Sequence, residues 1–425
     1  MPGMMLGTML LCFALSVSVA VSIGVASIIG LLTLGSVPMV VIPKEMFSSL
    51  DKFPLLAVPF FILAGKLMEE GGISTRLVDF AKSLVGGVQG GLAASCVITC
   101  LIFAAVSGSS VATTFAVGSI LIPALVRMGY PVNFSAALQA TSAELGVIIP
   151  PSIPMILYGV TAEVSIGELF VAGIGPGMLI AGALIAYVLI WARRNGMGKQ
   201  DGVGRLPLGQ SIIKAFWALL MPVIILGGIY GGIFTPTEAS AVAVVYALFV
   251  GIFIYKGLPI RRLPQVLRQS AVTSALIMFI IMCAGLFSYL VNYAGIPETL
   301  GHFLKETLHS PVYFLVGVNI ALFLVGMFVE TSAAIIVLAP ILAPVALYFG
   351  VDPVHFGLIM IVNLALGMIT PPVGVNLFAA CTVANISVDR IIKPLLPFVA
   401  VIIACLALIS AFPAISLTLR DWVFK

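Results

Sequence analysis

Charged residues are the component that this sequence has least of. Aspartate, glutamate, lysine and arginine make up 8% of the 425 residues, and hydrophobic residues make up 61%, whereas a soluble globular protein averages about 25% charged residues. Long uncharged runs lie before Lys44 and between Lys82 and Arg127, Glu168 and Arg193, Arg268 and Glu298, and Lys393 and Arg420. Since a membrane-spanning helix needs about 20 apolar residues, the composition excludes a water-soluble fold and predicts an all-α polytopic membrane protein.

Motifs of several enzyme classes are also absent. No GxxxxGKS/T phosphate-binding loop occurs, which excludes an ATP-driven pump within this chain. The histidines His302, His309 and His355 lie near expected helix ends, and every aspartate lies outside the apolar segments. Neither a serine nor an aspartyl intramembrane protease is therefore favoured. We expect no enzymatic activity and no organic cofactor.

Basic residues gather in the middle of the chain and indicate its orientation. Nine lie between residues 193 and 268, against two acidic residues; they are Arg193, Arg194, Lys199, Arg205, Lys214, Lys256, Arg261, Arg262 and Arg268. They flank two expected spans, near 215–233 and 237–256. Because two spans return the chain to the same side, both basic loops face one compartment, which is the cytoplasm by the positive-inside rule. In this setting they indicate a lipid bilayer, not nucleic acid, as the partner.

An internal repeat is visible in the sequence. Residues 103–159 align with 324–380 at a constant shift of 221, without gaps, and Pro150-Pro151 coincides with Pro371-Pro372. Two-fold repetition is typical of secondary transporters. We therefore divide the chain into a retained N-terminal membrane span without a cleavable leader (1–39), a first repeat (40–195), basic segments with two connecting spans (196–259) and a second repeat (260–425).

Each repeat contains a Gly-x-x-x-Pro-Pro element, which predicts broken helices over 146–152 and 367–373. A proline has no N–H to give to the carbonyl four residues earlier, so four carbonyls lose their helical partners, those of Gly146, Val147, Gly367 and Met368. Unpaired carbonyls are costly in hydrocarbon. We interpret the two elements as ligands of a monovalent cation; a proline kink satisfied by water or by a neighbouring hydroxyl is the alternative.

A second, polar interruption lies at matching places in the two repeats. Ser107-Gly108-Ser109-Ser110 lies near the middle of an uncharged run, and Glu330 is the only charged residue between Glu306 and Asp352. A carboxylate at bilayer depth usually marks a transport pathway. We predict two re-entrant hairpins with tips near 107–110 and 330–332; complete spans joined by ordinary loops are the alternative.

The four breaks together would supply hydroxyls, carbonyls, helix N-termini and one carboxylate. Helix N-termini favour anions and unwound carbonyls favour cations, so the pattern predicts that a small anionic solute and sodium bind together. The candidate solute contacts are Ser107, Ser109, Ser110, Ser152, Glu330 and Asn376; for Asn376, a hydrogen bond to a neighbouring backbone is the alternative. The alternative functions are an ion channel with a re-entrant filter and, less favoured, an intramembrane protease.

Four segments resemble the large membrane subunit of the tripartite ATP-independent periplasmic (TRAP) transporters. They are FAAVSGSSVATTFAVGSILIP (103–123), LGVIIPPSIPMILYG (145–159), GIFTPTEASA (232–241) and LGMITPPVGVNLF (366–378). The resemblance, which is greatest to the sialic acid branch, implies a sodium-coupled, elevator-type transporter of the bacterial inner membrane with scaffold and transport domains. It also implies a small TRAP membrane subunit and a periplasmic substrate-binding protein as partners, and a carboxylate-bearing solute such as a C4-dicarboxylate or a sialic acid.

By motif, the resemblance further implies two sodium sites, each between a hairpin tip and a broken helix. The residues of the first are Ser109, Gly146, Val147, Ile149 and Pro150. Those of the second are Gly326, Glu330, Thr331, Gly367, Met368 and Thr370. The second tip has Glu330 where the first has Ser109, so the two sites need not be equivalent.

Overall fold

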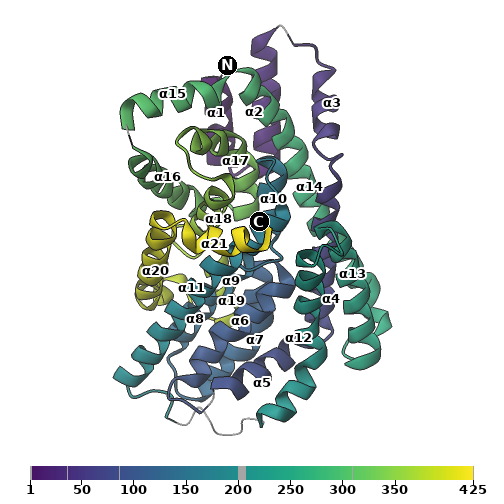
Figure 1. Ribbon diagram of the computed structural model, residues 1–425, viewed down its shortest axis with the longest axis vertical. Coiled ribbons are helices and arrows are strands. Elements are labelled where there is room, and N and C mark those ends of the chain that lie inside the picture. Colours follow the sequence, from purple (N-terminus) through teal and green to yellow (C-terminus); the bar gives the residue numbers. More distant parts are fainter. Residues whose placement is uncertain (1, 36, 86, 200–206, 309, 425) are drawn as a thin grey trace.

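The computed structural model describes residues 2–35, 37–85, 87–199, 207–308 and 310–424. Arg205 and His309, named above, lie outside these residues. Throughout the described part the regular structure is helical (Figure 1), which confirms the predicted all-α class. Within these residues, seven helices are long and apolar enough to cross a membrane, and three bent pairs of helices meet the same test when each pair is taken together.

The helices follow the predicted order. The N-terminal region and first repeat contain α1 (Pro2–Ala14), α2 (Val19–Leu34), α3 (Val41–Ser48), the 3-10 turn η1 (Phe53–Leu56), α4 (Ala57–Glu70), α5 (Ile73–Val85), α6 (Gly91–Ser107), α7 (Ser110–Arg127), α8 (Val132–Ala143), α9 (Leu145–Ile148), α10 (Ile153–Thr161) and α11 (Ile166–Arg194). Two connecting helices follow, α12 (Leu208–Tyr230) and α13 (Pro236–Phe249), the second extended by the π-helical turn η2 (Val250–Ile254). The second repeat contains η3 (Ile260–Arg262), α14 (Leu263–Tyr293), α15 (Ile296–Leu308), α16 (Pro311–Gly326), α17 (Thr331–Tyr348), α18 (Pro353–Met368), α19 (Val375–Ala384) and α20 (Val388–Ala411), and ends with α21 (Ala414–Phe424).

The N-terminal segment differs from the single span predicted over 1–39. Instead, α1 and α2 are two short helices that pack against each other, and α2 also packs on α14. The chain turns between them at Ser16, which has a left-handed φ of 59°. Serine side chains compete for backbone hydrogen bonds and favour turns, so Ser16 and Ser18 interrupt a run that is apolar on average.

The two repeats are present at the predicted shift and are inverted. Ser110 and Thr331 begin α7 and α17, and Val132 and Pro353 begin α8 and α18, so both pairs of helices obey the shift of 221. In Figure 1, α5 lies at the lower end of the molecule and its counterpart α15 at the upper end. This is the inverted-topology arrangement of secondary transporters.

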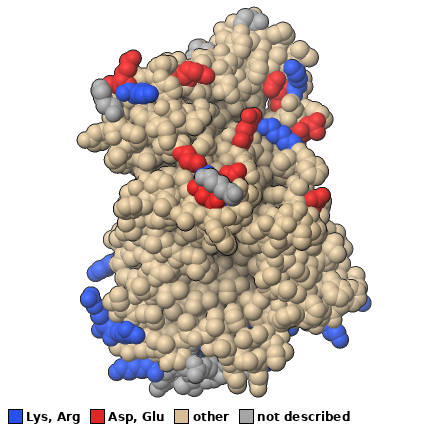
Figure 2. Space-filling model, viewed as in Figure 1, with Lys and Arg blue, Asp and Glu red and all other residues tan. Residues whose placement is uncertain are grey.

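The charges give the orientation of these repeats in the membrane. In Figure 2, Asp and Glu are seen only in the upper part of the molecule, beside some Lys and Arg, whereas Lys and Arg alone are seen toward the lower end. Consistent with inversion, α11 ends at Arg193-Arg194, whereas its counterpart α20 has Arg390 and Lys393 in its first turns. By the positive-inside rule, the lower end faces the cytoplasm and the upper end the periplasmic side.

The broken helices begin later than predicted. In the first repeat, α9 extends through Gly146 to Ile148, and in the second, α18 extends through Gly367 to Met368. A proline disfavours the helical conformation of the residue before it but leaves earlier residues free to be helical. The breaks therefore cover 149–152 and 369–374, and the Pro-Pro bond in each is cis.

The inverted topology predicts that the two ends of the repeats are accessible from opposite sides. In spheroplasts, a membrane-impermeant maleimide should label an exposed cysteine at Glu298→Cys on α15 directly, but one at Arg194→Cys, the last residue of α11, only once the membrane is permeabilised. The parent chain is the control, because five of its six cysteines are buried and Cys12 is partly so. Labelling of both variants from the same side would contradict the inversion.

Candidate functional site

The first hairpin tip is the turn between α6 and α7. Gly108 takes a left-handed φ of 60° there, and the Ser109 hydroxyl caps α7 by accepting a hydrogen bond from the Ala112 N–H at 3.4 Å. The Ser107 and Thr113 hydroxyls form a further hydrogen bond of 3.0 Å. Short polar side chains thus hold the turn closed while the N-terminus of α7 points out of it.

The second tip lies between α16 and α17 and covers residues 327–330, not the predicted 330–332, because Thr331 and Ser332 already belong to α17. The Glu330 carboxylate caps this helix: it accepts hydrogen bonds from the N–H of Ser332 at 2.9 Å and of Ala333 at 3.2 Å, and from the Ser332 hydroxyl at 2.9 Å. The positive N-terminal end of a helix stabilises such a negative charge. Glu330 therefore has the same capping role as Ser109, but adds a full charge.

The first tip lies directly against the first broken helix. A Cβ atom on Gly146 would lie 2.7 Å from the Ser109 carbonyl oxygen and 2.9 Å from Thr113 Oγ1. Such distances are too short for any side chain, so glycine is required for this approach. Two of the residues assigned by motif to the first sodium site, Ser109 and Gly146, are thereby brought together.

The second tip lies against the second broken helix in the same way. A Cβ atom on Gly367 would lie 2.3 Å from the carbonyl carbon of Gly326. The Met327 carbonyl accepts hydrogen bonds from the N–H of Val373 and of Gly374, both at 3.3 Å. The residues assigned to the second sodium site thus come from two segments whose backbones touch.

Two of the four carbonyls predicted to be unpaired have partners. The Ser152 hydroxyl donates to the Val147 carbonyl at 2.6 Å, and the Thr370 N–H donates to the Gly367 carbonyl at 2.9 Å. At Val147 the structure shows the alternative given above, a neighbouring hydroxyl, and at Gly367 a tighter turn replaces the lost helical bond. A carbonyl has two lone pairs, so each of these oxygens keeps one available for a cation.

Both tips open onto one cavity of about 680 Å³, which we call the tip cavity. Its walls also include α4, the first turns of α10 and the middle of α14. The polar residues that line it are Lys66, Glu69, Ser107, Ser109, Ser110, Thr273, Glu330 and Ser332. A single chamber thus receives the two tips from one side and helices α4 and α14 from the other.

Four of the six predicted solute contacts line this cavity: Ser107, Ser109, Ser110 and Glu330. Ser152 and Asn376 are not among the lining residues and are fully buried. Asn376 accepts a hydrogen bond from the Thr114 hydroxyl and donates to the Ala140 carbonyl at 3.1 Å. The structure therefore gives Ser152 and Asn376 the role of holding the surrounding backbone.

Three charged residues near the site were missed in the sequence. Lys66 and Glu69 form an ion pair of 2.7 Å on the wall from α4. Glu144 is 2% exposed, and its Oε1 accepts a hydrogen bond of 2.7 Å from the amide of Asn376. Glu144 is the only charged residue between Arg127 and Glu163, so the same reasoning that singled out Glu330 could have found it.

Solved structures with a similar fold are transporters. The YdaH transporter of Alcanivorax borkumensis superposes with a TM-score of 0.65 at 16% identity, covering 92% of this chain and 90% of that one. MtrF of Neisseria gonorrhoeae gives a TM-score of 0.61 at 18% identity, covering 88% and 84%. At such low identities these similarities establish the fold alone.

The sequence decides the family. The protein-family model described as "Tripartite ATP-independent periplasmic transporter, DctM component" matches residues 6–415. The chain belongs to this family. As a TRAP large permease it is a multi-pass protein of the bacterial inner membrane, as its apolar helices and the resemblance of its motifs predicted.

Curated relatives are named for several different solutes. A C4-dicarboxylate TRAP large permease of Pseudomonas aeruginosa is 44% identical over 89% of this chain and 89% of its own. An isethionate TRAP permease of Oleidesulfovibrio alaskensis is 42% identical over 96% of this chain, which spans only 65% of that relative. A sialic acid TRAP large permease of Vibrio cholerae is 36% identical over 89% of this chain and 88% of its own. The predicted preference for the sialic acid branch is therefore not supported.

The backbone contact at the second tip predicts that a side chain at Gly367 destabilises the protein. Gly367→Ala should lower the melting temperature of the purified protein, because overpacking typically costs about 1–3 kcal/mol and the new Cβ would lie 2.3 Å from Gly326. Gly317→Ala on α16, where a Cβ meets nothing within 4 Å, is the matched control. A Gly367→Ala protein as stable as that control would contradict the close contact.

Proposed function

We propose that this chain is the membrane-embedded translocation subunit of a sodium-coupled, binding-protein-dependent secondary transporter. Its solute would be a small carboxylate-bearing anion of the C4-dicarboxylate or sialic acid type, in line with the anions named for its relatives. The observation that carries the proposal is the tip cavity, which is walled by both hairpin tips and by α4 and α14. Such a chamber between inverted repeats is where secondary transporters bind solute and ion.

The side of the cavity next to α7 suits the anion. The first N–H groups of a helix have no partner within that helix, and their partial positive charge attracts anions. The N-terminus of α7 opens on the cavity together with the hydroxyls of Ser107, Ser109 and Ser110. Lys66 adds an ammonium group on the facing wall, where Glu69 orients it.

The contacts behind the tips suit sodium. At each tip a hairpin backbone touches a helix broken before a Pro-Pro pair, so that backbone carbonyls and hydroxyls converge, and these are the ligands that hard cations prefer. At the second tip, Glu330 contributes a carboxylate. A carboxylate accepts hydrogen bonds and repels an anionic solute, so we assign Glu330 to the cation and not to the solute.

The two walls of the cavity support an elevator mechanism. The helices around the two tips contact each other across the repeats: α10 packs on α17, and α7 packs on α19. These helices would move together as the transport domain. The facing wall belongs to α4 and α14, which pack on each other and on α13 and α2, and would form the scaffold. A solute held between the two groups would cross the membrane when one slides past the other.

Glu330→Gln tests the sodium assignment. The change keeps the size of the side chain and one capping oxygen but removes the charge, so the sodium concentration for half-maximal uptake should rise about tenfold, or about 1.4 kcal/mol. The measurement is solute uptake into proteoliposomes that contain the complete transporter, titrated with sodium.

Glu306→Gln, which removes an exposed glutamate on α15, is the matched control and should titrate like the unchanged chain. An unchanged sodium titration for Glu330→Gln would remove this residue from the ion site. Ion flux without solute, and no solute uptake driven by a sodium gradient, would indicate a channel instead.

Dependence on partners is a separate expectation. We propose that the solute is delivered by a periplasmic binding protein and that a small membrane subunit completes the transporter. The chain reconstituted alone should then show no uptake, and addition of both partners should restore it. Full uptake by the isolated chain would contradict the three-part assembly without bearing on the sodium assignment.

A further inference from the structure

A second cavity lies at the periplasmic end of the second repeat. Its volume is about 740 Å³, within the range of small-molecule pockets. Aliphatic side chains of α16 and α20, among them Leu315, Val316, Ile403 and Leu406, line most of it. Val316 and Ile403 also belong to the exposed apolar surface of the molecule. The cavity therefore opens sideways, toward the bilayer.

The corresponding place in the first repeat is filled by aromatic rings. There Phe134 stacks on Trp191 with the ring centroids 3.6 Å apart. At the shift of 221, His355 takes the place of Phe134 and Phe412 that of Trp191, and Phe412 is 57% exposed. The two side chains that close the space in one repeat are thus replaced or turned away in the other.

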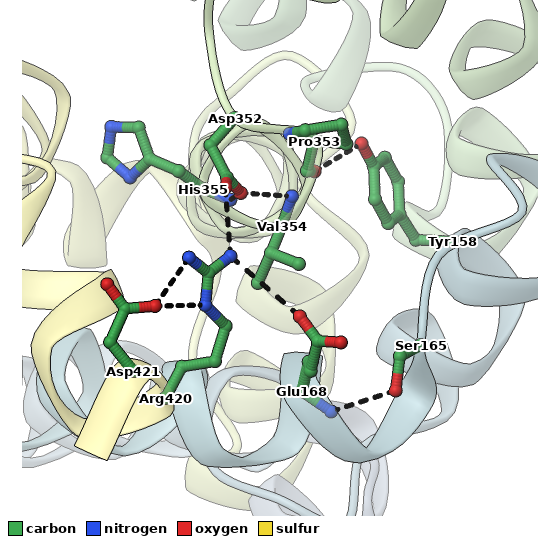
Figure 3. A network of polar contacts seen from close by, with 9 residues as sticks. All are labelled: Tyr158, Ser165, Glu168, Asp352, Pro353, Val354, His355, Arg420 and Asp421. Carbon is green, nitrogen blue, oxygen red and sulfur yellow. Dashed lines mark hydrogen bonds and ion pairs between the residues drawn. The ribbon is translucent and has the colours of Figure 1, made fainter. Parts of the chain in front are cut away.

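His355 places a polar group inside this apolar cavity. The side chain is 2% exposed and lines the cavity. The Ser410 backbone is near the imidazole, but within the described residues neither ring nitrogen makes a hydrogen bond. A buried polar group without a partner is unfavourable, so the ring is poised for an oxygen from a ligand. Figure 3 shows it turned away from the neighbouring charged groups.

Those charged groups form a network of ion pairs (Figure 3), of which Asp352 lines the cavity. Arg420 lies 2.9 Å from Asp352, 2.7 Å from Asp421 and 3.8 Å from Glu168, so three carboxylates surround one guanidinium. Burial alone would raise the pKa of Asp352, a cavity-lining residue, but Arg420 and the N–H groups of α18 hold that pKa below its usual range. Asp352 is therefore ionised at neutral pH, and its carboxylate attracts cations.

We propose that this cavity binds a phospholipid of the outer leaflet whose headgroup carries an amine, as in phosphatidylethanolamine. One acyl chain lies along the aliphatic wall of α16 and α20. An ester or phosphate oxygen accepts a hydrogen bond from the His355 imidazole, and the headgroup ammonium lies beside Asp352. The site is independent of the transported solute and of the coupling ion.

Native mass spectrometry of the detergent-purified full chain tests the site. Phosphatidylethanolamine and phosphatidylglycerol with identical acyl chains are added separately, and the bound fraction is measured. We expect roughly tenfold weaker retention of phosphatidylethanolamine in His355→Phe, which restores the residue of the first repeat, and in Leu406→Trp, which fills the cavity from the opposite wall. Val245→Trp adds the same bulk to the exposed face of α13 and is the control that should retain the lipid.

A variant is taken as folded when it elutes from size-exclusion chromatography like the unchanged chain. Two cavity variants are used so that the test remains possible if one of them does not fold. Equal retention by the unchanged chain and both cavity variants would overturn the site. Equal retention of phosphatidylglycerol would overturn the amine headgroup. Loss of the lipid when the small membrane subunit is added would show that a protein helix, and not a lipid, covers this cavity.

Discussion

The whole architecture depends on one constraint: in hydrocarbon, each backbone N–H and carbonyl must find a partner inside the protein. The four helix breaks at the centre of this molecule satisfy this constraint in different ways. Ser109 and Glu330 cap the helices that start at the tips, Ser152 occupies the Val147 carbonyl, and each tip is buried against a broken helix from its own repeat. Breaks that would be unstable if exposed to lipid are thereby stable when they are buried against one another.

Inversion of the repeats gives two copies of this arrangement with different chemistry. The same backbone position carries Ser109 in one copy and Glu330 in the other, so one tip is neutral and the second is charged. Away from the centre, a stacked Phe134 in one copy becomes, in the other, a buried His355 whose ring nitrogens have no hydrogen-bond partner among the described residues. The two copies therefore share the packing of their helices but differ in single side chains at equivalent positions.

Much of the fold follows from residues whose effects are local. Glycine, proline and charge act within a turn of helix, so the repeat and the approximate positions of Pro150 and Pro371 in broken helices could be predicted. The direction in which a polar side chain points depends instead on the rotation of its helix within the bundle. An almost uniformly apolar sequence barely specifies this rotation. Asn376 was therefore expected in the cavity but lies behind it, whereas Lys66, on a wall that the repeat motifs do not mark, was missed.

The contact between Gly326 and Gly367 consists of backbone alone, and this limits how the molecule can diversify. A contact without side chains has no rotamers that can adjust, so the two backbones either pack in one register or lose the contact. The opposite wall of the tip cavity is different, because Lys66, Glu69 and Thr273 can be exchanged there without disturbing the glycine contact. Under the proposed function, the ion ligands at the second tip and these cavity-facing residues would therefore lie in parts of the chain that can change independently.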